Sequence, residues 1–280
     1  MKITASMVKD LREITGAGMM DCKKALSECD GDMEGAKEFL RKKGQAIANK
    51  KSSRETREGA LSVCLKDDKA VMVKIACETD FVAINDNFTT FISKIAEQAI
   101  EVGTDGLMEQ TGSAGPIKEQ FVEAIAKLGE NIVYLEGQSW QAAENSVINY
   151  YTHTNNKIAV LVEVEAEGSA DLGKVKEVVK NVAMHVAATE VKAISEDDLD
   201  PAAVEKEKNF LMDQARESGK PENIIEKMVI GRLNKFKKDV CLMDQNYVKD
   251  PDRTIAQYIT DSSKDVGGGL TVKRFHKESF

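Results

Sequence analysis

One succession of elements occurs twice along this chain, and that duplication restricts its fold more than any other feature of the sequence. Each copy is predicted as strand, turn, strand, loop and helix. Apolar residues alternate with polar ones in the two strands, and they then recur about every 3.6 residues in the helix. The copies lie at residues 60–102 and 147–188, and their turn residues Asp68 and Asn156 are 88 positions apart. A repeat of this kind predicts two related α+β subdomains packed side by side.

The remaining core elements extend these two copies. A further helix over 117–128 follows the first copy, and we place the first core subdomain at 59–140. A helix near 254–262 and a final strand over 270–275 end the second core subdomain, which we place at 141–280. The fold class predicted for the body of the chain is therefore α+β.

The segment 1–44 predicts a small domain of three short helices. Thr4 or Ser6 can cap the first helix, because their hydroxyls accept hydrogen bonds from free backbone N–H groups. Two glycines separate the first helix from the second, and Asp32 can cap the third. The helical pattern is predicted to end at Gly44.

A charged stretch without aromatic residues follows at 45–58, and we interpret it as a linker that is partly helical at its start. Residues 1–58 hold 13 basic and 10 acidic side chains, whereas the whole chain has a net charge of −8. A slightly basic head therefore precedes an acidic body, which indicates two modules with different surfaces.

Two charged helices with a thin apolar stripe are predicted over 201–239, as an insertion in the second core subdomain. Pro201 can begin the first helix, and a turn at 218–221 reverses the chain to give an antiparallel helical hairpin. Two interpretations stay open at this point. The hairpin either projects toward a partner or packs against its own subdomain.

The composition excludes several classes of protein. Hydrophobic residues make up 42% of the 280 residues, too many for a disordered chain, yet no apolar run approaches the roughly 18 residues that span a bilayer. The five cysteines lack a C-x-x-C pair and the three histidines lie far apart, so we expect no metal site. We expect a cytoplasmic protein that binds neither membrane nor nucleic acid directly, because it lacks a secretory signal and its charge balance is acidic.

The sequence contains no pattern typical of covalent catalysis. Gly16 and Gly18 resemble the start of a dinucleotide site, but no strand precedes them and the third glycine is missing. The glycines at 267–269 are not followed by the Lys-Ser/Thr of a phosphate loop. We therefore expect a binding protein rather than an enzyme, with no cofactor.

Two segments fit a purely structural role poorly. Met19 and Met20 are adjacent in a predicted helix, so one apolar stripe cannot bury both. Either one of them adapts to the surface of a partner, or both fill gaps between short helices. In the loop 77–83, Phe81 follows Asp80, and this ring either folds back on the core or stays exposed as an interface anchor.

Several motifs occur in an order that is typical of one family. Residues 11–26 read LREITGAGMMDCKKAL and residues 78–83 read ETDFVA. They are followed by GENI at 129–132, MHVAA at 184–188 and SGKP at 218–221. Together these motifs span essentially the whole chain, and they resemble the signatures of bacterial translation elongation factor Ts.

The resemblance implies a function. Members of this family are guanine nucleotide exchange factors for elongation factor Tu: they bind its GDP form, expel GDP and leave a nucleotide-free complex that GTP resolves. The three-helix head of the family is similar to ubiquitin-associated domains. Its helical hairpin is an insertion that helps some members to form homodimers, which makes a homodimer through 201–239 an expectation here.

The resemblance also implies which turn acts on the partner. Thr79, Asp80, Phe81 and Val82 match the segment that displaces magnesium from elongation factor Tu. Phe81 would wedge between helices of the partner, and Asp80 would disturb the groups around the ion. The magnesium belongs to the partner, so this chain is expected to bind none itself.

Other partner contacts implied by the resemblance are dispersed along the chain. Arg12, Met19, Met20 and Lys23 match N-terminal residues that touch the nucleotide-binding domain of the partner. His153 matches a partner-contacting histidine of the second core subdomain. The family commonly has glycine just after that histidine, whereas this chain continues Thr-Asn-Asn.

Overall fold

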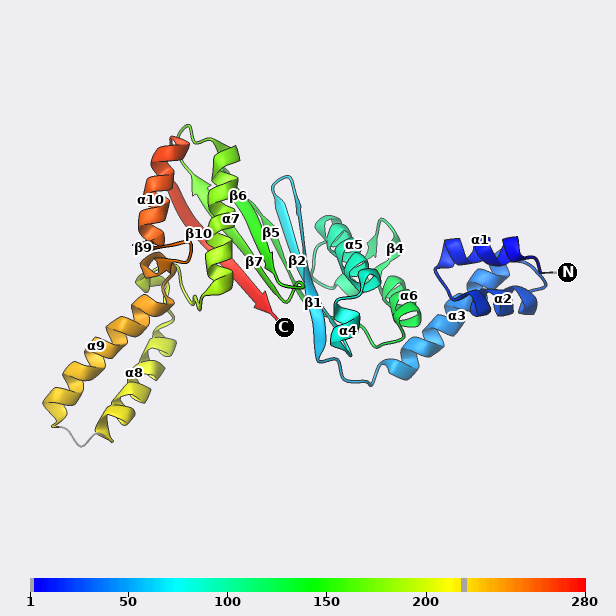
Figure 1. Ribbon diagram of the computed structural model, residues 1–280, viewed down its shortest axis with the longest axis horizontal. Coiled ribbons are helices and arrows are strands. Elements are labelled where there is room, and N and C mark those ends of the chain that lie inside the picture. Colours follow the sequence, from blue (N-terminus) through cyan, green and yellow to red (C-terminus); the bar gives the residue numbers. More distant parts are fainter. Residues whose placement is uncertain (1–2, 218–220) are drawn as a thin grey trace. The chain divides into compact units, whose positions relative to one another are not determined.

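The computed structural model describes residues 3–217 and 221–280 (Figure 1). Helices and strands are mixed, and the two main sheets have three strands each. Among the described residues, no helix is both long enough and apolar enough to cross a membrane. The turn predicted at 218–221 lies outside the described residues apart from Pro221.

The chain divides into two compact units. The first comprises Met1–Trp140, His153–Ala159 and Glu278–Phe280, and the second comprises Gln141–Thr152 and Val160–Lys277. The first unit contains the first predicted repeat and the second unit most of the second repeat, and each unit contains most of one main sheet.

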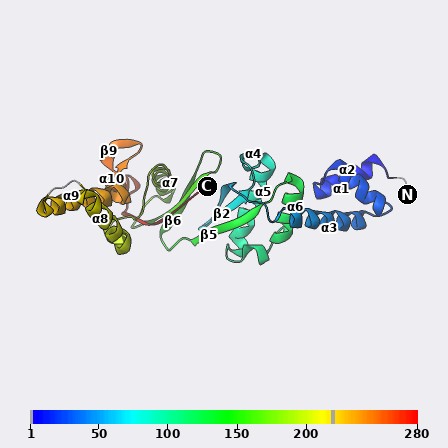
Figure 2. The ribbon, with the colours of Figure 1, turned by 90° about the horizontal axis from the view of Figure 1, so that it is seen from below.

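The first unit begins with three helices, α1 (Ala5–Thr15), α2 (Met19–Glu28) and α3 (Met33–Lys51), of which α1 and α2 lie on the same side of α3 (Figure 2). Thr4, one of the two predicted candidates, caps α1 by accepting the N–H of Met7, and Asp32 caps α3 as the sequence predicted. A small apolar core joins the three helices. Its fully buried members are Leu11, Cys22, Ala25, Leu26 and Ala36.

Helix α3 does not end at Gly44, so this part of the sequence prediction is wrong. The helix continues through Lys51, and the segment predicted as a linker at 45–58 is helical over its first half. The extension packs against α6 (Ile117–Leu128), and Ala48 is buried in the core of the first sheet. This packing offsets the penalty of about 1 kcal/mol that glycine brings to a helix interior.

The first sheet has the strand order β1-β2-β5, with β1 (Glu58–Lys66), β2 (Lys69–Cys77) and β5 (Val133–Gln141). Strands β1 and β2 form an antiparallel hairpin. Helix α5 (Asp86–Val102) packs against β1 and β2, because its apolar residues recur at helical spacing. Short elements complete the unit: α4 (Asp80–Ala83), η1 (Leu107–Glu109), β3 (Thr111–Gly112) and β4 (Gly115–Pro116).

The second sheet has the order β10-β7-β6, with β6 (Ser146–His153), β7 (Ile158–Ala166) and β10 (Leu270–Ser279). Its third strand adds beside the second strand of the hairpin, as in the first sheet. Helix α7 (Leu172–Ala188) lies across this sheet in Figure 1, and α10 (Ile255–Val266) packs beside α7. Short elements complete the unit: η2 (Glu196–Asp198), η3 (Leu242–Asp244), β8 (Asn246–Tyr247) and β9 (Asp250–Thr254).

The predicted helical hairpin consists of α8 (Pro201–Arg216) and α9 (Glu222–Val240), which lie side by side (Figure 1). A separate apolar cluster joins the end of α8 to the first half of α9, so a thin stripe is sufficient to hold the two helices together. Its buried members are Leu211, Ala215, Ile225 and Val229.

A buried histidine ties the base of the hairpin to α7. Val248 donates its N–H to Nδ1 of His185 at 3.3 Å, so the other ring nitrogen carries the proton and donates to Oε1 of Gln245 at 2.8 Å. The amide nitrogen of Gln245 donates to the carbonyl oxygens of Glu190 and Asp239, at 2.8 and 2.6 Å. This arrangement requires neutral imidazole at His185.

The stability of the protein should therefore depend on the protonation of His185. Burial lowers the pKa of His185 below its ordinary value of 6.5, although the hydrogen bond with Gln245 opposes the shift. Below pH 6.5 the unfolded chain takes up a proton before the folded chain does, so acid lowers the free energy of unfolding. We expect the melting temperature to fall between about pH 7.5 and about pH 5.5, and to fall less in His185→Gln.

Parallel profiles for the wild type and His185→Gln would contradict this account.

Candidate partner-binding site

The turn that follows strand β2 displays a phenylalanine to solvent. The loop predicted at 77–83 contains the single-turn helix α4, because Oγ1 of Thr79 accepts the N–H of Val82 at 3.3 Å and caps it. Phe81 is 77% exposed, and Asp80 beside it is also exposed. The interpretation in which Phe81 folds back on the core is therefore wrong.

The opposite side of this turn is anchored in the apolar core. Ala83 is fully buried, and Val82 packs against the cluster formed by β1, β2 and α5. One side of α4 thus points inward while Phe81 points outward. Ile84, just beyond α4, is 55% exposed and adds a second apolar side chain to the exposed side.

A carboxylate from the loop after α6 holds the start of the turn. Oε2 of Glu130 accepts the backbone N–H groups of Glu78 and Thr79, each at 3.0 Å. Oε1 of Glu130 accepts the hydroxyl hydrogen of Thr79 at 2.6 Å. An ionised carboxylate is an acceptor only, so it matches these three donors, and such charge-assisted hydrogen bonds are stronger than neutral ones.

The loop after α6 also donates hydrogen bonds back to the segment that precedes the turn. Asn131 donates its N–H to Oε1 of Glu78 at 2.6 Å, and its side-chain amide donates to the carbonyl oxygen of Arg54 at 2.9 Å. Cys77 donates its thiol hydrogen to the carbonyl oxygen of Thr79 at 3.2 Å, and burial raises the pKa of Cys77 to about 12. The thiol is therefore protonated near neutral pH and acts as a structural donor.

The head presents its predicted contact residues to solvent. Met19 is 60% exposed and Met20 is 73% exposed, so they do not fill gaps between the helices. Both lie in the first turn of α2, directly after Gly18, while Cys22 faces the core. The predicted contact residues Arg12 and Lys23 are exposed as well. The head thus combines flexible apolar side chains with positive charge.

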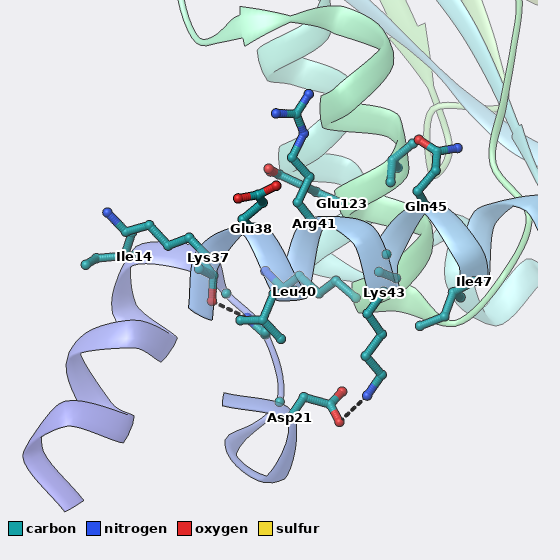
Figure 3. Close-up of a pocket in the computed structure, with 18 of the residues that line it drawn as sticks. Ile14, Asp21, Lys37, Glu38, Leu40, Arg41, Lys43, Gln45, Ile47 and Glu123 are labelled. Carbon is teal, nitrogen blue, oxygen red and sulfur yellow. Dashed lines mark hydrogen bonds and ion pairs between the residues drawn. The ribbon is translucent and has the colours of Figure 1, made fainter. Parts of the chain in front are cut away.

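An open groove of about 1030 Å³ runs between the loop after α1, helix α3 and helix α6. Figure 3 shows Asp21 and Lys43 paired across it, at 2.5 Å between Oδ1 and Nζ. Arg41 forms a second ion pair with Glu119. Because acidic and basic groups pair with one another here, the groove lacks the excess of one charge that a phosphate or metal site requires.

His153 lies at the end of β6, where the chain enters the turn between β6 and β7. It is exposed, and it groups with the first compact unit rather than with the second core subdomain in which the sequence prediction placed it. The turn bonds to β1, since Leu61 donates its N–H to the carbonyl oxygen of Asn156 at 2.8 Å and Lys157 pairs with Glu58 at 2.5 Å.

Within the turn, Thr154, Asn155 and Asn156 have positive φ values of 27, 52 and 59°. Asparagine tolerates this left-handed conformation, in which glycine is the usual residue.

The predicted contact residues thus lie on three separate elements: the head, the α4 turn and the β6–β7 turn. They do not form one pocket, an arrangement that suits an extended protein interface better than a small-molecule site. The motif at 129–132 is recognisable in the sequence, but the sequence assigned no role to Glu130. Gly129 marks the end of α6 in the sequence, but no local signal connects Glu130 with its donors, which lie more than fifty positions away.

Known proteins resemble this chain over nearly its whole length. A family described as "Elongation factor TS" matches residues 78–277. The chain is 43% identical over 272 residues to elongation factor Ts of Magnetococcus marinus, a match that covers 95% of this chain and 89% of that protein. For elongation factor Ts of Hydrogenovibrio crunogenus the identity is 46% over 272 residues, with the same two coverages of 95% and 89%.

Elongation factor Ts of Clostridium perfringens is 42% identical over 279 residues, which cover 98% of this chain and 91% of that protein. These matches include the head as well as both sheets, and they agree with the motifs in the sequence. The chain therefore belongs to the elongation factor Ts family.

Proposed function

We propose that this chain is the guanine nucleotide exchange factor of elongation factor Tu and acts in the cytoplasm during translation elongation. Membership in the elongation factor Ts family supports this role. The structural observation that carries it is the exposure of Phe81 on a turn anchored in the core. The chain performs no covalent chemistry in this role and touches neither nucleic acid nor membrane.

In the proposed complex, the turn of Thr79, Asp80, Phe81 and Val82 enters elongation factor Tu near its magnesium ion. The ring of Phe81 wedges between helices of the partner, and the carboxylate of Asp80 disturbs the groups around the ion. Magnesium is held largely by nucleotide phosphates and a few protein oxygens, so loosening its ligands weakens the binding of GDP.

The energetics follow from linkage. This chain and GDP each weaken the binding of the other to elongation factor Tu by the same factor. The contacts made with nucleotide-free Tu must therefore offset the lost contacts with GDP. Complete burial of the Phe81 ring supplies roughly 1.5–3 kcal/mol toward that offset.

We assign docking to the remaining exposed residues. Arg12, Met19, Met20 and Lys23 contact the nucleotide-binding domain of Tu, and His153 makes a contact from the β6–β7 turn. The head then acts as a domain similar to ubiquitin-associated domains. In both sheets a later strand lies beside the second strand of a hairpin, which supports a duplicated, two-lobed core. The α8–α9 hairpin is then an insertion in this core.

Removal of the Phe81 ring tests the proposal. Phe81→Ala should lower the maximal rate of GDP release from Tu at least about tenfold. Losing roughly 1.4 kcal/mol of the interaction free energy between the ring and the partner corresponds to that factor. The readout is the release of labelled GDP at saturating exchange factor. Stability should change little, since the ring is exposed.

Leu172→Ala is the matched control, because Leu172 is also an exposed apolar residue, 52% accessible, at the start of α7. It should release GDP at the wild-type rate. If the wild type binds Tu without speeding GDP release, the chain is an adaptor and the exchange proposal fails.

The methionine pair should act on affinity rather than on the maximal rate. Replacing Met19 and Met20 together by alanine should raise the half-saturation concentration for Tu about tenfold. This change is expected when two interface side chains each make a modest contribution to the binding free energy. The same GDP-release assay, run across a range of exchange-factor concentrations, separates the two parameters. A normal half-saturation concentration with a lower maximal rate would refute docking by this pair.

We further propose that two copies of the chain associate through the α8–α9 hairpin. Phe210 and Ile230 on this hairpin are each 60% exposed, and Ile224 is 43% exposed. Light scattering of the full chain should give the mass of a dimer, and the double variant Phe210→Ser with Ile230→Ser should give a monomer. A monomeric wild type at micromolar concentration would exclude this mode of association.

A further inference from the structure

The position of the Phe81 turn depends on one side chain that lies outside it. The end of strand β2 leaves the N–H groups of Glu78 and Thr79 without partners in the sheet, and both donate to the carboxylate of Glu130. Backbone donors that leave a sheet are satisfied by side chains or by water. Here a single carboxylate satisfies two of them and fixes the direction in which the chain leaves β2.

The hydroxyl of Thr79 transmits this constraint to α4. It donates its hydrogen to Glu130 at 2.6 Å and accepts the N–H of Val82 at 3.3 Å. Because the hydrogen is committed to Glu130, the oxygen lone pairs are directed to the helix. A helix of one turn is not stable alone, so the conformation of α4 relies on this cap.

The loop of Glu130 is itself held in place. Asn131 is 4% exposed and bonds to Glu78 and Arg54, and Ile132 is buried in the core beside α5. The carboxylate is thus fixed from behind, so it can position the turn rather than follow it. Together the two segments have bonds in both directions, which restricts sliding of one along the other.

We infer that Glu130 is a positioning residue for nucleotide exchange: its carboxylate holds the Thr79–Val82 turn in the conformation that presents Phe81. This inference rests on the proposed exchange function. A turn that is ordered before binding loses less conformational entropy in the complex. The interaction energy of the ring is then available for displacing the partner's ion and nucleotide.

The test compares Glu130→Ala with the conservative Glu130→Gln in the full chain. In the glutamine variant the amide oxygen can still accept both backbone N–H groups, and the amide nitrogen can donate to Thr79 Oγ1. Two quantities are measured: hydrogen exchange of the Glu78 and Thr79 amides in the free protein, and GDP release from Tu. Glu101→Ala, at an exposed carboxylate of α5, is the control.

We expect Glu130→Ala to speed exchange of the two amides and to lower the maximal rate of GDP release, each about tenfold. The half-saturation concentration should stay within about threefold, because the docking residues of the head are untouched. Glu130→Gln and Glu101→Ala should resemble the wild type in both measurements. Glutamine keeps the hydrogen-bonding groups but has no charge. Wild-type behaviour of Glu130→Gln would therefore show that Glu130 acts by positioning the turn and not through its negative charge.

Normal GDP release by Glu130→Ala, together with faster amide exchange, would overturn the inference while leaving the exchange function intact. A wild type that fails to speed GDP release would instead refute the proposed function, and the inference with it. If Glu130→Ala does not fold, Glu130→Asp replaces it with the same expectations, since its shorter side chain withdraws the carboxylate from Thr79.

Discussion

The turn that carries Phe81 begins and ends in one apolar core. Cys77 before it and Ala83 after it are both fully buried, in a cluster shared with α5 and α6. Protein interiors are close-packed, so neither end can shift without opening a cavity or forcing an overlap. The freedom that remains lies between these two points, and hydrogen bonds to Glu130 remove most of it. The exposed side chain is consequently rigid at its base although water surrounds its ring.

Phe81 and Met20, the two most exposed of the large apolar side chains in the described part of the chain, both lie in family signatures. Phe81, Met19 and Met20 are all more than half exposed, whereas the apolar residues of α5, which follows the turn, are largely buried. Scattered exposed apolar residues are normal for a soluble protein. An aromatic ring held outward by a cap and a carboxylate is different, because local hydrogen bonding maintains an exposure that the hydrophobic effect alone would oppose.

The sequence predicted the elements that depend on local pattern, including the cap Asp32 and the hairpin strands of both sheets, and it reduced the cap of α1 to Thr4 or Ser6. It misplaced the end of α3, because packing of Ala48 against the first-sheet core overrides the weak local signal of Gly44. The role of Glu130 could not be found from the sequence. Its donors lie more than fifty positions away, and such pairings are set by tertiary structure alone.

The chemistry of the turn follows from what already occupies its amides. Backbone N–H groups before a helix normally offer a site for phosphate or another anion. In this chain the N–H groups of Glu78 and Thr79 are taken by Glu130, so they cannot bind a phosphate oxygen. The exposed groups on this side are the carboxylate of Asp80 and the apolar side chains of Phe81 and Ile84. The carboxylate of Asp80 repels phosphates and attracts a cation, so this surface suits the proposed displacement of the partner's magnesium ion better than it suits binding of the nucleotide.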